Sequence, residues 1–307
     1  MLTETLSSVR PRGRISLNGP TMGTRYAAVF YGSHAPRGLA EALSRAVTEV
    51  DEQMSTWKPE SDLMRFNRAP PGEWVTVPDR LMHVVEAGLA IGRLTAGAFD
   101  IGVLDLVSAW GFNRRDGTPN AVDVESLAGK VRLPAHELVE LDPGGGRMCK
   151  TRPVTLDLSG IAKGYGVDRL AETMHEFGIG DYLVSIDGEV RARGRRADGS
   201  PWRVALEAPI PGRREIAGFV ELDDAALATS GDYRHRVTLD GKTYAHTMDL
   251  RTGRPLDNRI QAVTVRAPSC MHADAWATAV MVAGKSALPL VRSLGMEAII
   301  ALPADND

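Results

Sequence analysis

The chain has 307 residues, of which 43% are hydrophobic and 24% are charged, and its formal net charge is -3. This composition predicts a globular protein with a sizeable core and excludes an intrinsically disordered chain. The near-neutral balance gives no general reason to expect nucleic acid as a partner, and the richest basic stretch, R-A-R-G-R-R at 191–196, is interpreted as the solvated end of a hairpin.

The first residues and the cysteines bear on the compartment. The N-terminus, M-L-T-E-T-L-S-S-V-R, lacks the apolar core of a secretory signal, and no apolar run reaches the roughly 18–20 residues that cross a bilayer. We therefore expect a cytoplasmic protein with no transmembrane segment, or a periplasmic one if a leader has been removed. Cys149 and Cys270 share no metal-ligand spacing, and whether they form a disulfide is left open.

The N-terminal half is expected to contain two long helices. Residues 1–18 are predicted to form a flexible segment and residues 19–307 a single folded domain. A strand is expected at Thr24–Tyr31. Apolar side chains three and four apart predict an amphipathic helix over residues 36–57, with a core face of Leu39, Leu43, Ala46, Val47, Val50 and Met54. Pro78 and Asp79 open a second helix that runs to about residue 95, before Gly97.

The C-terminal half is expected to be rich in strands. Two short runs around P-G-G-G predict a hairpin within residues 136–152, and a strand-like run ending at Asp157 precedes a helix over about residues 161–177. Asp240-Gly241 predicts a tight hairpin turn. A helix from about Ala273 and a strand at Glu297–Leu302 end the fold. Further strands are predicted at Tyr182–Arg193, Trp202–Ala208, Gly218–Leu222, Arg234–Leu239, Thr243–Asp249 and Gln261–Ala267.

These elements predict the fold class. The strands cluster between separated helices instead of alternating with them, and no change of composition marks a linker. We therefore predict an α+β fold with mostly antiparallel sheets and packed helices, in one unit with two lobes.

The stretch V-T-L-D-L-S-G-I-A-K-G-Y-G at 154–166 is similar to a phosphate-binding strand, turn and helix. It matches neither G-x-x-x-x-G-K-[ST] nor G-x-G-x-x-G. Lys163 lies in the first turn of a helix whose N–H groups can face an anion. An ionised Asp157 would repel phosphate unless a cation or a donor group lay between them. The stretch therefore predicts that Asp157 contacts a ligand hydroxyl or base, with a metal-bridged phosphate nearby.

Asp274 and Thr278 are four residues apart in M-H-A-D-A-W-A-T-A-V-M at 271–281. Near the start of a helix, both side chains would lie on one face, and carboxylate and hydroxyl oxygens suit Mg²⁺. The alternative is that Asp274 caps the helix and Thr278 faces the core.

Three further residues could carry chemistry, each with a structural alternative. His246, followed closely by Asp249, could act as a general base near neutral pH or be an ordinary strand histidine. Asp100 could accept a hydrogen bond from the ring N–H of a flat ligand or belong to a plain helix-to-loop junction. Trp57, after the first long helix, could stack on a flavin or adenine ring or cap the core.

Together these segments resemble the FAD:protein FMN transferases of the ApbE family. Each motif alone is weak, but seven in the family's order are highly specific. They span roughly residues 20–285: M-G-T at 22–24, M-S-T-W and L-M-R-F-N within 54–67, G-A-F-D at 97–100, L-D-L-S-G-I-A-K-G-Y-G-V-D at 156–168, S-G-D-Y-R at 230–234, H-T-M-D-L-R-T-G-R-P at 246–255 and A-D-A-W-A-T-A at 273–279.

The resemblance implies an enzyme that binds FAD and Mg²⁺, transfers the FMN half of FAD to a threonine or serine hydroxyl of a target flavoprotein, and releases AMP. It implies that the Gly160 carbonyl and the side chains of Asp274 and Thr278 hold the cation. It places FAD contacts on Met22, Trp57, Ala98, Phe99, Asp100, Asp157, Lys163 and Met248.

Two positions depart from the family pattern, and both leave the expected role intact. Trp57 stands where tyrosine is common, and both rings stack. Met248-Asp249-Leu250 stands where the family has an aliphatic residue before Asp-Pro, and a backbone contact at Met248 tolerates that change. The family suggests membrane electron-transfer subunits as acceptors. Its frequent lipoprotein leader is not visible here.

The expected mechanism is nucleophilic attack on the pyrophosphate of FAD. We expect Lys163 to add positive charge beside the phosphates and His246 to take the proton of the incoming hydroxyl. Two other functions remain open: an FAD pyrophosphatase giving FMN and AMP, and a non-catalytic FAD-binding protein. The presence of Asp274, Thr278 and His246 argues against the carrier, which has no need of a metal.

Overall fold

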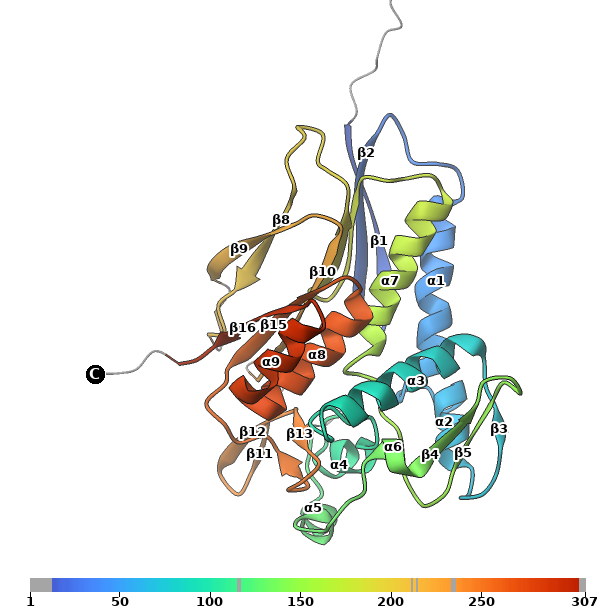
Figure 1. The fold of residues 1–307 in the computed structure, drawn as a ribbon, viewed down its shortest axis with the longest axis vertical. Coiled ribbons are helices and arrows are strands. Elements are labelled where there is room, and N and C mark those ends of the chain that lie inside the picture. The colour runs from blue at the N-terminus through green and yellow to red at the C-terminus, as the bar shows by residue number, and fades with distance from the viewer. Residues whose placement is uncertain (1–12, 115–116, 211, 214, 233–235, 304–307) are drawn as a thin grey trace, which may run out of the picture.

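The computed structural model describes residues 13–114, 117–210, 212–213, 215–232 and 236–303, and its largest element is a seven-stranded sheet (Figure 1). Every neighbouring pair in the sheet is antiparallel. In spatial order its strands are β1 (Gly13–Thr21), β2 (Thr24–Gly32), β6 (Tyr182–Ile186), β7 (Glu189–Arg193), β10 (Ala225–Gly231), β15 (Ala262–Ala267) and β16 (Glu297–Ala301).

Side chains alternate between the two faces of this sheet, as the strand period of two requires. Along β2, Ala28 and Phe30 share a core with helices α1 (Leu39–Met54) and α7 (Ala162–Glu176). Val29 points the other way, into a core with the hairpin of β8 (Trp202–Glu207) and β9 (Ile216–Leu222). Helix α8 (Cys270–Ala283) packs beside α7 and over β10 and β15 (Figure 1).

A second lobe packs against the ends of α1, α7 and α8 (Figure 1). It contains α2 (Asp62–Arg68), α3 (Asp79–Leu94), α6 (Ala135–Leu138) and a sheet of β3 (Val75–Thr76), β5 (Arg147–Lys150) and β4 (Val139–Asp142). Leu81 of α3, Met148 of β5 and Trp276 of α8 belong to one buried cluster. The two lobes therefore share a continuous core.

A smaller cluster is built around Trp110, Val237 and Met248. It joins α4 (Leu104–Ala109) and α5 (Ala121–Leu127) to the short strands β11 (Arg236–Leu239), β12 (Lys242–Ala245) and β13 (Met248–Asp249). Strand β14 (Arg254–Pro255) pairs with β13. The chain ends after η1 (Gly284–Ala287), α9 (Leu288–Ser293) and β16.

The predicted α+β class with mostly antiparallel sheets is confirmed. The four predicted helices and the hairpins at 136–152 and Asp240-Gly241 are present with slightly shifted ends. No helix in the described ranges is long and apolar enough to cross a membrane. Cys149 and Cys270 are buried free thiols, so the question of a disulfide between them is answered in the negative.

Several strand predictions were wrong. Residues 13–18, predicted to be flexible, belong to β1, while residues 1–12 lie outside the described residues. The single strand expected at Tyr182–Arg193 is two strands, because Asp187 and Gly188 turn the chain with φ of 49° and 108°. Strand β10 was not predicted.

Three smaller differences concern the segments that contain Asp157, His246 and the S-G-D-Y-R motif. The run that ends at Asp157 is not part of a strand. The strand expected at Thr243–Asp249 is interrupted at His246 and Thr247. Residues 233–235, which include part of the S-G-D-Y-R motif and the start of the strand expected at Arg234–Leu239, lie outside the described residues.

Candidate active site

The turn before α7 is organised by Asp157. Its Oδ1 accepts hydrogen bonds from the backbone nitrogen of Ser159, at 2.7 Å, and from the Ser159 hydroxyl. This carboxylate-to-backbone turn directs the chain through Gly160 into α7. Burial raises the pKa of the Asp157 carboxyl, and the bonds from Ser159 offset part of that rise. Asp157 thus has a local structural role, and its contact with a ligand stays a prediction.

Gly160 brings the turn close to α8 and to Phe99. A Cβ atom at Gly160 would lie 3.3 Å from Cε2 of Phe99 and 3.5 Å from Oγ1 of Thr278. Only a residue without a side chain fits this approach without displacing a neighbour. The Gly160 backbone and the Thr278 hydroxyl are therefore neighbours, although they are far apart in sequence.

Helices α7 and α8 cross in close contact at Gly164. Its backbone nitrogen donates a 2.9 Å hydrogen bond to Oδ2 of Asp274, and a Cβ on Gly164 would lie 2.3 Å from the carbonyl oxygen of Cys270. The N-cap of α8 is Ser269, whose hydroxyl accepts from the backbone of His272. The alternative in which Asp274 caps α8 is therefore excluded.

This bond satisfies a backbone donor at the start of α7. The N-cap of α7 is Ile161, so the nitrogen of Gly164, the third helical residue, has no acceptor within the helix, and Asp274 supplies one. Gly160 precedes the N-cap, and no backbone nitrogen within the described ranges donates to its carbonyl oxygen.

The carbonyl of Gly160, the hydroxyl of Thr278 and the carboxylate of Asp274 form a set of hard oxygen donors. Mg²⁺ prefers such donors and retains several waters or phosphate oxygens, so this set fits that ion. Among the described residues, no group of three or more His, Cys, Asp or Glu side chains could hold a metal ion. A cation site in this region would depend on one carboxylate and two neutral oxygens.

A second carboxylate, on Asp168, fixes the register of the two helices. Its oxygens accept hydrogen bonds of 2.9 Å from the backbone nitrogens of Cys270 and Met271 in the first turn of α8. Oδ1 also accepts from Arg191 at 2.6 Å. The interpretation of residues 191–196 as a solvated hairpin end is therefore wrong for Arg191, although the ion pair of Arg195 with Asp223 is exposed.

Lys163 forms an ion pair with Glu189 of β7, and only 3% of the Glu189 side chain is exposed. Burial raises the pKa of the Glu189 carboxyl to about 7, against the opposing effect of the Lys163 charge. The pKa of Lys163 is itself raised: burial acts to lower it, but the charges of Glu189 and Asp274 outweigh burial. We conclude that the ammonium stays charged at neutral pH.

The G-A-F-D loop lies beside the turn before α7. Asp100 holds this loop to the start of α6, because its Oδ1 accepts from Gly102 at 2.6 Å and its Oδ2 accepts from Ala135 at 3.0 Å. Burial raises the pKa of this carboxyl, and the backbone donors partly offset the rise. Phe99 is buried against Gly160, so its ring is part of the core, whereas Ala98 is half-buried.

Of the remaining predicted flavin contacts, Met22 packs against α7 and Trp57 is exposed. Met22 lies in the β1–β2 turn with φ of 45°, and its Cε is 3.0 Å from where a Cβ on Gly166 would be. Met22 therefore contacts α7 one turn after Lys163. Trp57 follows the end of α1 and is 56% exposed, so its indole is not part of the core.

Met248 belongs to the smaller cluster, and His246 lies beside Phe112, which packs against that cluster. The His246 ring lies 6.3 Å from that of Phe112, and Met248 is buried. Asp249 is engaged by Arg251, which donates to both carboxylate oxygens. Leu250 connects this cluster to the G-A-F-D loop, since its Cδ2 is 4.0 Å from the Cβ position of Gly97.

Three residues of the site were missed by sequence reasoning: Glu189, Asp168 and Arg191. Glu189 and Arg191 are two apart on β7, so both face α7. The Asp-Gly pair at 187–188 was the available signal, because a hairpin there would have defined which side chains share a face.

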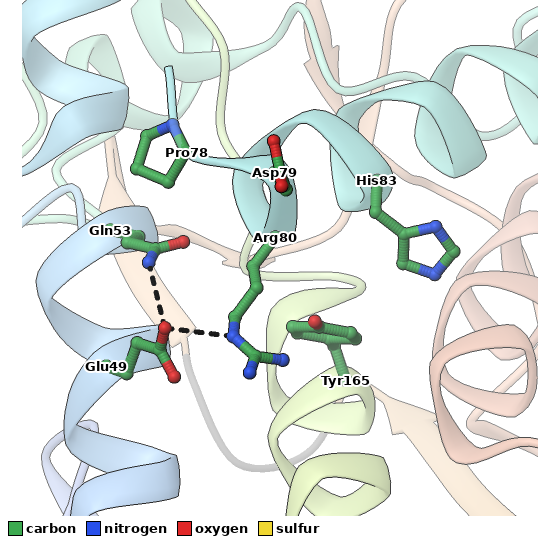
Figure 2. Close-up of a pocket in the computed structure, with 7 residues that line it drawn as sticks. All are labelled: Glu49, Gln53, Pro78, Asp79, Arg80, His83 and Tyr165. Carbon is green, nitrogen blue, oxygen red and sulfur yellow. Dashed lines mark hydrogen bonds and ion pairs between the residues drawn. The ribbon is translucent and has the colours of Figure 1, made fainter. Parts of the chain in front are cut away.

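A separate hollow of about 450 Å³ lies between α1, α3 and Tyr165 of α7 (Figure 2). In it Glu49 accepts hydrogen bonds from Gln53 and, at 2.9 Å, from Arg80. None of the predicted site residues lines this hollow. Glu49 and Arg80 form an ion pair with each other, and we assign the hollow no ligand.

Comparisons with known proteins agree on one family. A model of the ApbE family matches residues 22–300. An FAD:protein FMN transferase of Vibrio cholerae is 39% identical over 281 residues, covering 90% of this chain and 83% of the relative. One of Escherichia coli is 35% identical over 298 residues, covering 95% and 84%.

Solved structures agree with this result. The flavin transferase ApbE from Vibrio cholerae superimposes with a TM-score of 0.84 at 35% identity, covering 96% of this chain and 95% of that one. The ApbE protein from Thermotoga maritima gives a TM-score of 0.83 at 29% identity, covering 94% of each chain.

Proposed function

The chain belongs to the ApbE family, and on that premise we propose that it is an FAD:protein FMN transferase. In this reaction the FMN half of FAD passes to a threonine or serine hydroxyl of a target flavoprotein, and AMP is released. The observation that carries the proposal is the meeting of Gly160, Thr278 and Asp274 beside Lys163. Oxygen donors next to a fixed ammonium suit a pyrophosphate substrate.

Mg²⁺ would be held by the Gly160 carbonyl, the Thr278 hydroxyl and the Asp274 carboxylate. When bound, it would neutralise charge on the pyrophosphate and on the departing AMP. Lys163 would hold a second positive charge beside the phosphates, because Glu189 anchors its side chain at the start of α7. The exposed indole of Trp57 would stack on a ring of FAD.

The chemical step would join the acceptor to the phosphorus on the FMN side. The hydroxyl oxygen forms the new P–O bond, the bond from that phosphorus to the bridging oxygen breaks, and AMP leaves with that oxygen. We assign His246 as the base that takes the hydroxyl proton. Leu250, four residues after His246, lies beside Gly97 of the G-A-F-D loop, and this position of the segment supports the assignment.

The acceptor would be a flavoprotein subunit of a membrane electron-transfer complex, which is the kind of target suggested by the family. The reaction would then take place in the compartment in which that subunit exposes its hydroxyl.

Measuring AMP release tests the activity against its two rivals. The protein is incubated with FAD and Mg²⁺, with and without an extract of the source cells, and covalent flavin is detected by fluorescence of denaturing gels. We expect AMP and a fluorescent protein band only when the extract is present. AMP without the extract would indicate a pyrophosphatase, and no AMP in either case would indicate a flavin carrier.

A further inference from the structure

Glu189 has an unusual environment for a residue that serves stability alone. It is almost fully buried, its Oε1 pairs with Lys163, and its Oε2 is buried with no hydrogen-bond partner among the described residues. A buried polar atom without a partner is destabilising, and more so when it is charged. Buried pairs that stabilise a fold normally satisfy their remaining atoms. The pair therefore points to a role in the site.

The position of Lys163 shows what that role is. Its ammonium is subject to the negative charges of both Glu189 and Asp274. Lys163 and Gly164 are consecutive, and Gly164 bonds Asp274, so the lysine begins next to that carboxylate. The ion pair that Lys163 forms is nevertheless with Glu189, on the neighbouring strand.

An ammonium on Asp274 would compete with a divalent cation for the same oxygen atoms. We propose that Glu189 is a positioning residue that retains the Lys163 ammonium, so that Asp274 stays available to a divalent cation and the positive charge stays beside the phosphates. This inference rests on the proposed function. Glu189 itself need not touch the cation or the flavin.

A double-mutant cycle on metal binding tests this role. Mn²⁺ is the probe, and electron paramagnetic resonance of the free ion measures its binding to wild type, Glu189→Gln, Lys163→Met and the double variant, each with and without FAD. We expect Glu189→Gln to weaken Mn²⁺ binding about tenfold or more. In the Lys163→Met background, the same substitution should change it less than about twofold, because no ammonium is left to compete.

Two further variants sharpen the experiment. Glu172→Gln is the matched control, because Glu172 pairs with Arg169 on the same helix and its side chain is 52% exposed. It should leave Mn²⁺ binding unchanged. Glu189→Asp keeps the charge but shortens the reach, so it should weaken binding only when Lys163 is present. Glu189→Asp also replaces Glu189→Gln in the cycle if circular dichroism shows that Glu189→Gln does not fold.

The outcomes separate this inference from the proposed function. If Glu189→Gln leaves Mn²⁺ binding unchanged, or weakens it equally with and without Lys163, the positioning role is wrong while the transferase can stand. If wild type neither binds Mn²⁺ nor releases AMP, the proposed function fails and the inference fails with it. Strong coupling between the two substitutions supports the role.

Discussion

The backbone nitrogen of Gly164 donates a 2.9 Å hydrogen bond to Oδ2 of Asp274. That single bond joins α7 to α8 and satisfies a backbone donor in the first turn of α7. It also fixes Asp274 one helical turn before Thr278, whose hydroxyl lies beside Gly160. The positions of these oxygens follow from how closely the two helices approach.

Gly164→Ala tests the importance of this close approach. The added methyl group would lie 2.3 Å from the carbonyl oxygen of Cys270 and 2.7 Å from Cβ of Asp274, so the helices must separate. We expect a loss of about 1–3 kcal/mol in the free energy of urea unfolding, together with weaker Mn²⁺ binding. Gly180→Ala is the control, because a Cβ there meets nothing within 4 Å. Equal stability of the two variants would contradict the close packing.

Asp168→Asn tests the second link between the helices. The amide group cannot accept at both positions, so the backbone nitrogen of Cys270 or Met271 loses its partner, and Arg191 loses its ionised partner. We expect a loss of about 2 kcal/mol in thermal or urea unfolding, less than for a fully buried ion pair because the Arg191 side chain is 31% exposed. Asp223→Asn removes only the exposed pair with Arg195 and should have little effect. A similar loss in both variants would contradict the role of Asp168 in linking α7 to α8.

Trp57→Ala should weaken FAD binding and leave the fold unchanged, because the indole is 56% exposed. Ring stacking is worth about 0.5–1.5 kcal/mol beyond area burial, so we expect a several-fold rise in the Kd from flavin fluorescence titration. Trp57→Phe should recover part of the affinity. Trp74→Ala is a matched control at another partly exposed tryptophan. A Kd unchanged by Trp57→Ala would remove Trp57 from the flavin site.

The turn after His246 should show an acid-sensitive contribution from Asp249. Burial acts to raise the pKa of Asp249, but the hydrogen bonds and charge of Arg251 lower it overall. The unfolded carboxyl titrates near pH 3.9. A folded pKa below that value means that the stabilisation is present above about pH 4 and is lost as the pH falls through the folded pKa.

Urea unfolding of wild type and Asp249→Asn at several pH values measures this contribution. The difference in stability should be constant from about pH 7 to 5 and shrink as the pH falls below about 4. Arg251→Gln should remove the same acid-dependent component. A difference that grows on acidification would reverse the sign of the pKa shift.

The fold was largely predictable from local signals, and the failures have identifiable causes. Helices α1, α3 and α7 follow from apolar spacing and from their terminal residues. Strand β10, A-A-L-A-T-S-G, was missed because small residues have weak strand propensity, and its position comes from pairing with β7 and β15. The turn at Asp187-Gly188 was missed because the flanking apolar alternation continues through it.

The candidate site was predictable only as a set of separate segments. The motifs supplied Gly160, Asp274 and Thr278, but the approach of Gly160 to Thr278 and the bond from Gly164 to Asp274 depend on where α8 crosses α7. Glu189 carries no motif signal of its own, and its pairing with Lys163 becomes visible only when β7 lies under α7. Tertiary packing therefore determines which of these groups meet.

The most direct test of the transferase account is the effect of Asp274→Asn on flavin transfer. This variant keeps an oxygen that can accept from Gly164 but removes the negative charge that a divalent cation needs. Wild type and variant, both shown to be folded, are incubated with FAD, Mg²⁺ and cell extract, and covalent flavin on the acceptor is measured by gel fluorescence and mass spectrometry. We predict Mg²⁺-dependent transfer by wild type and a loss of at least about a hundredfold in the variant. Transfer at the wild-type rate by Asp274→Asn would contradict the account.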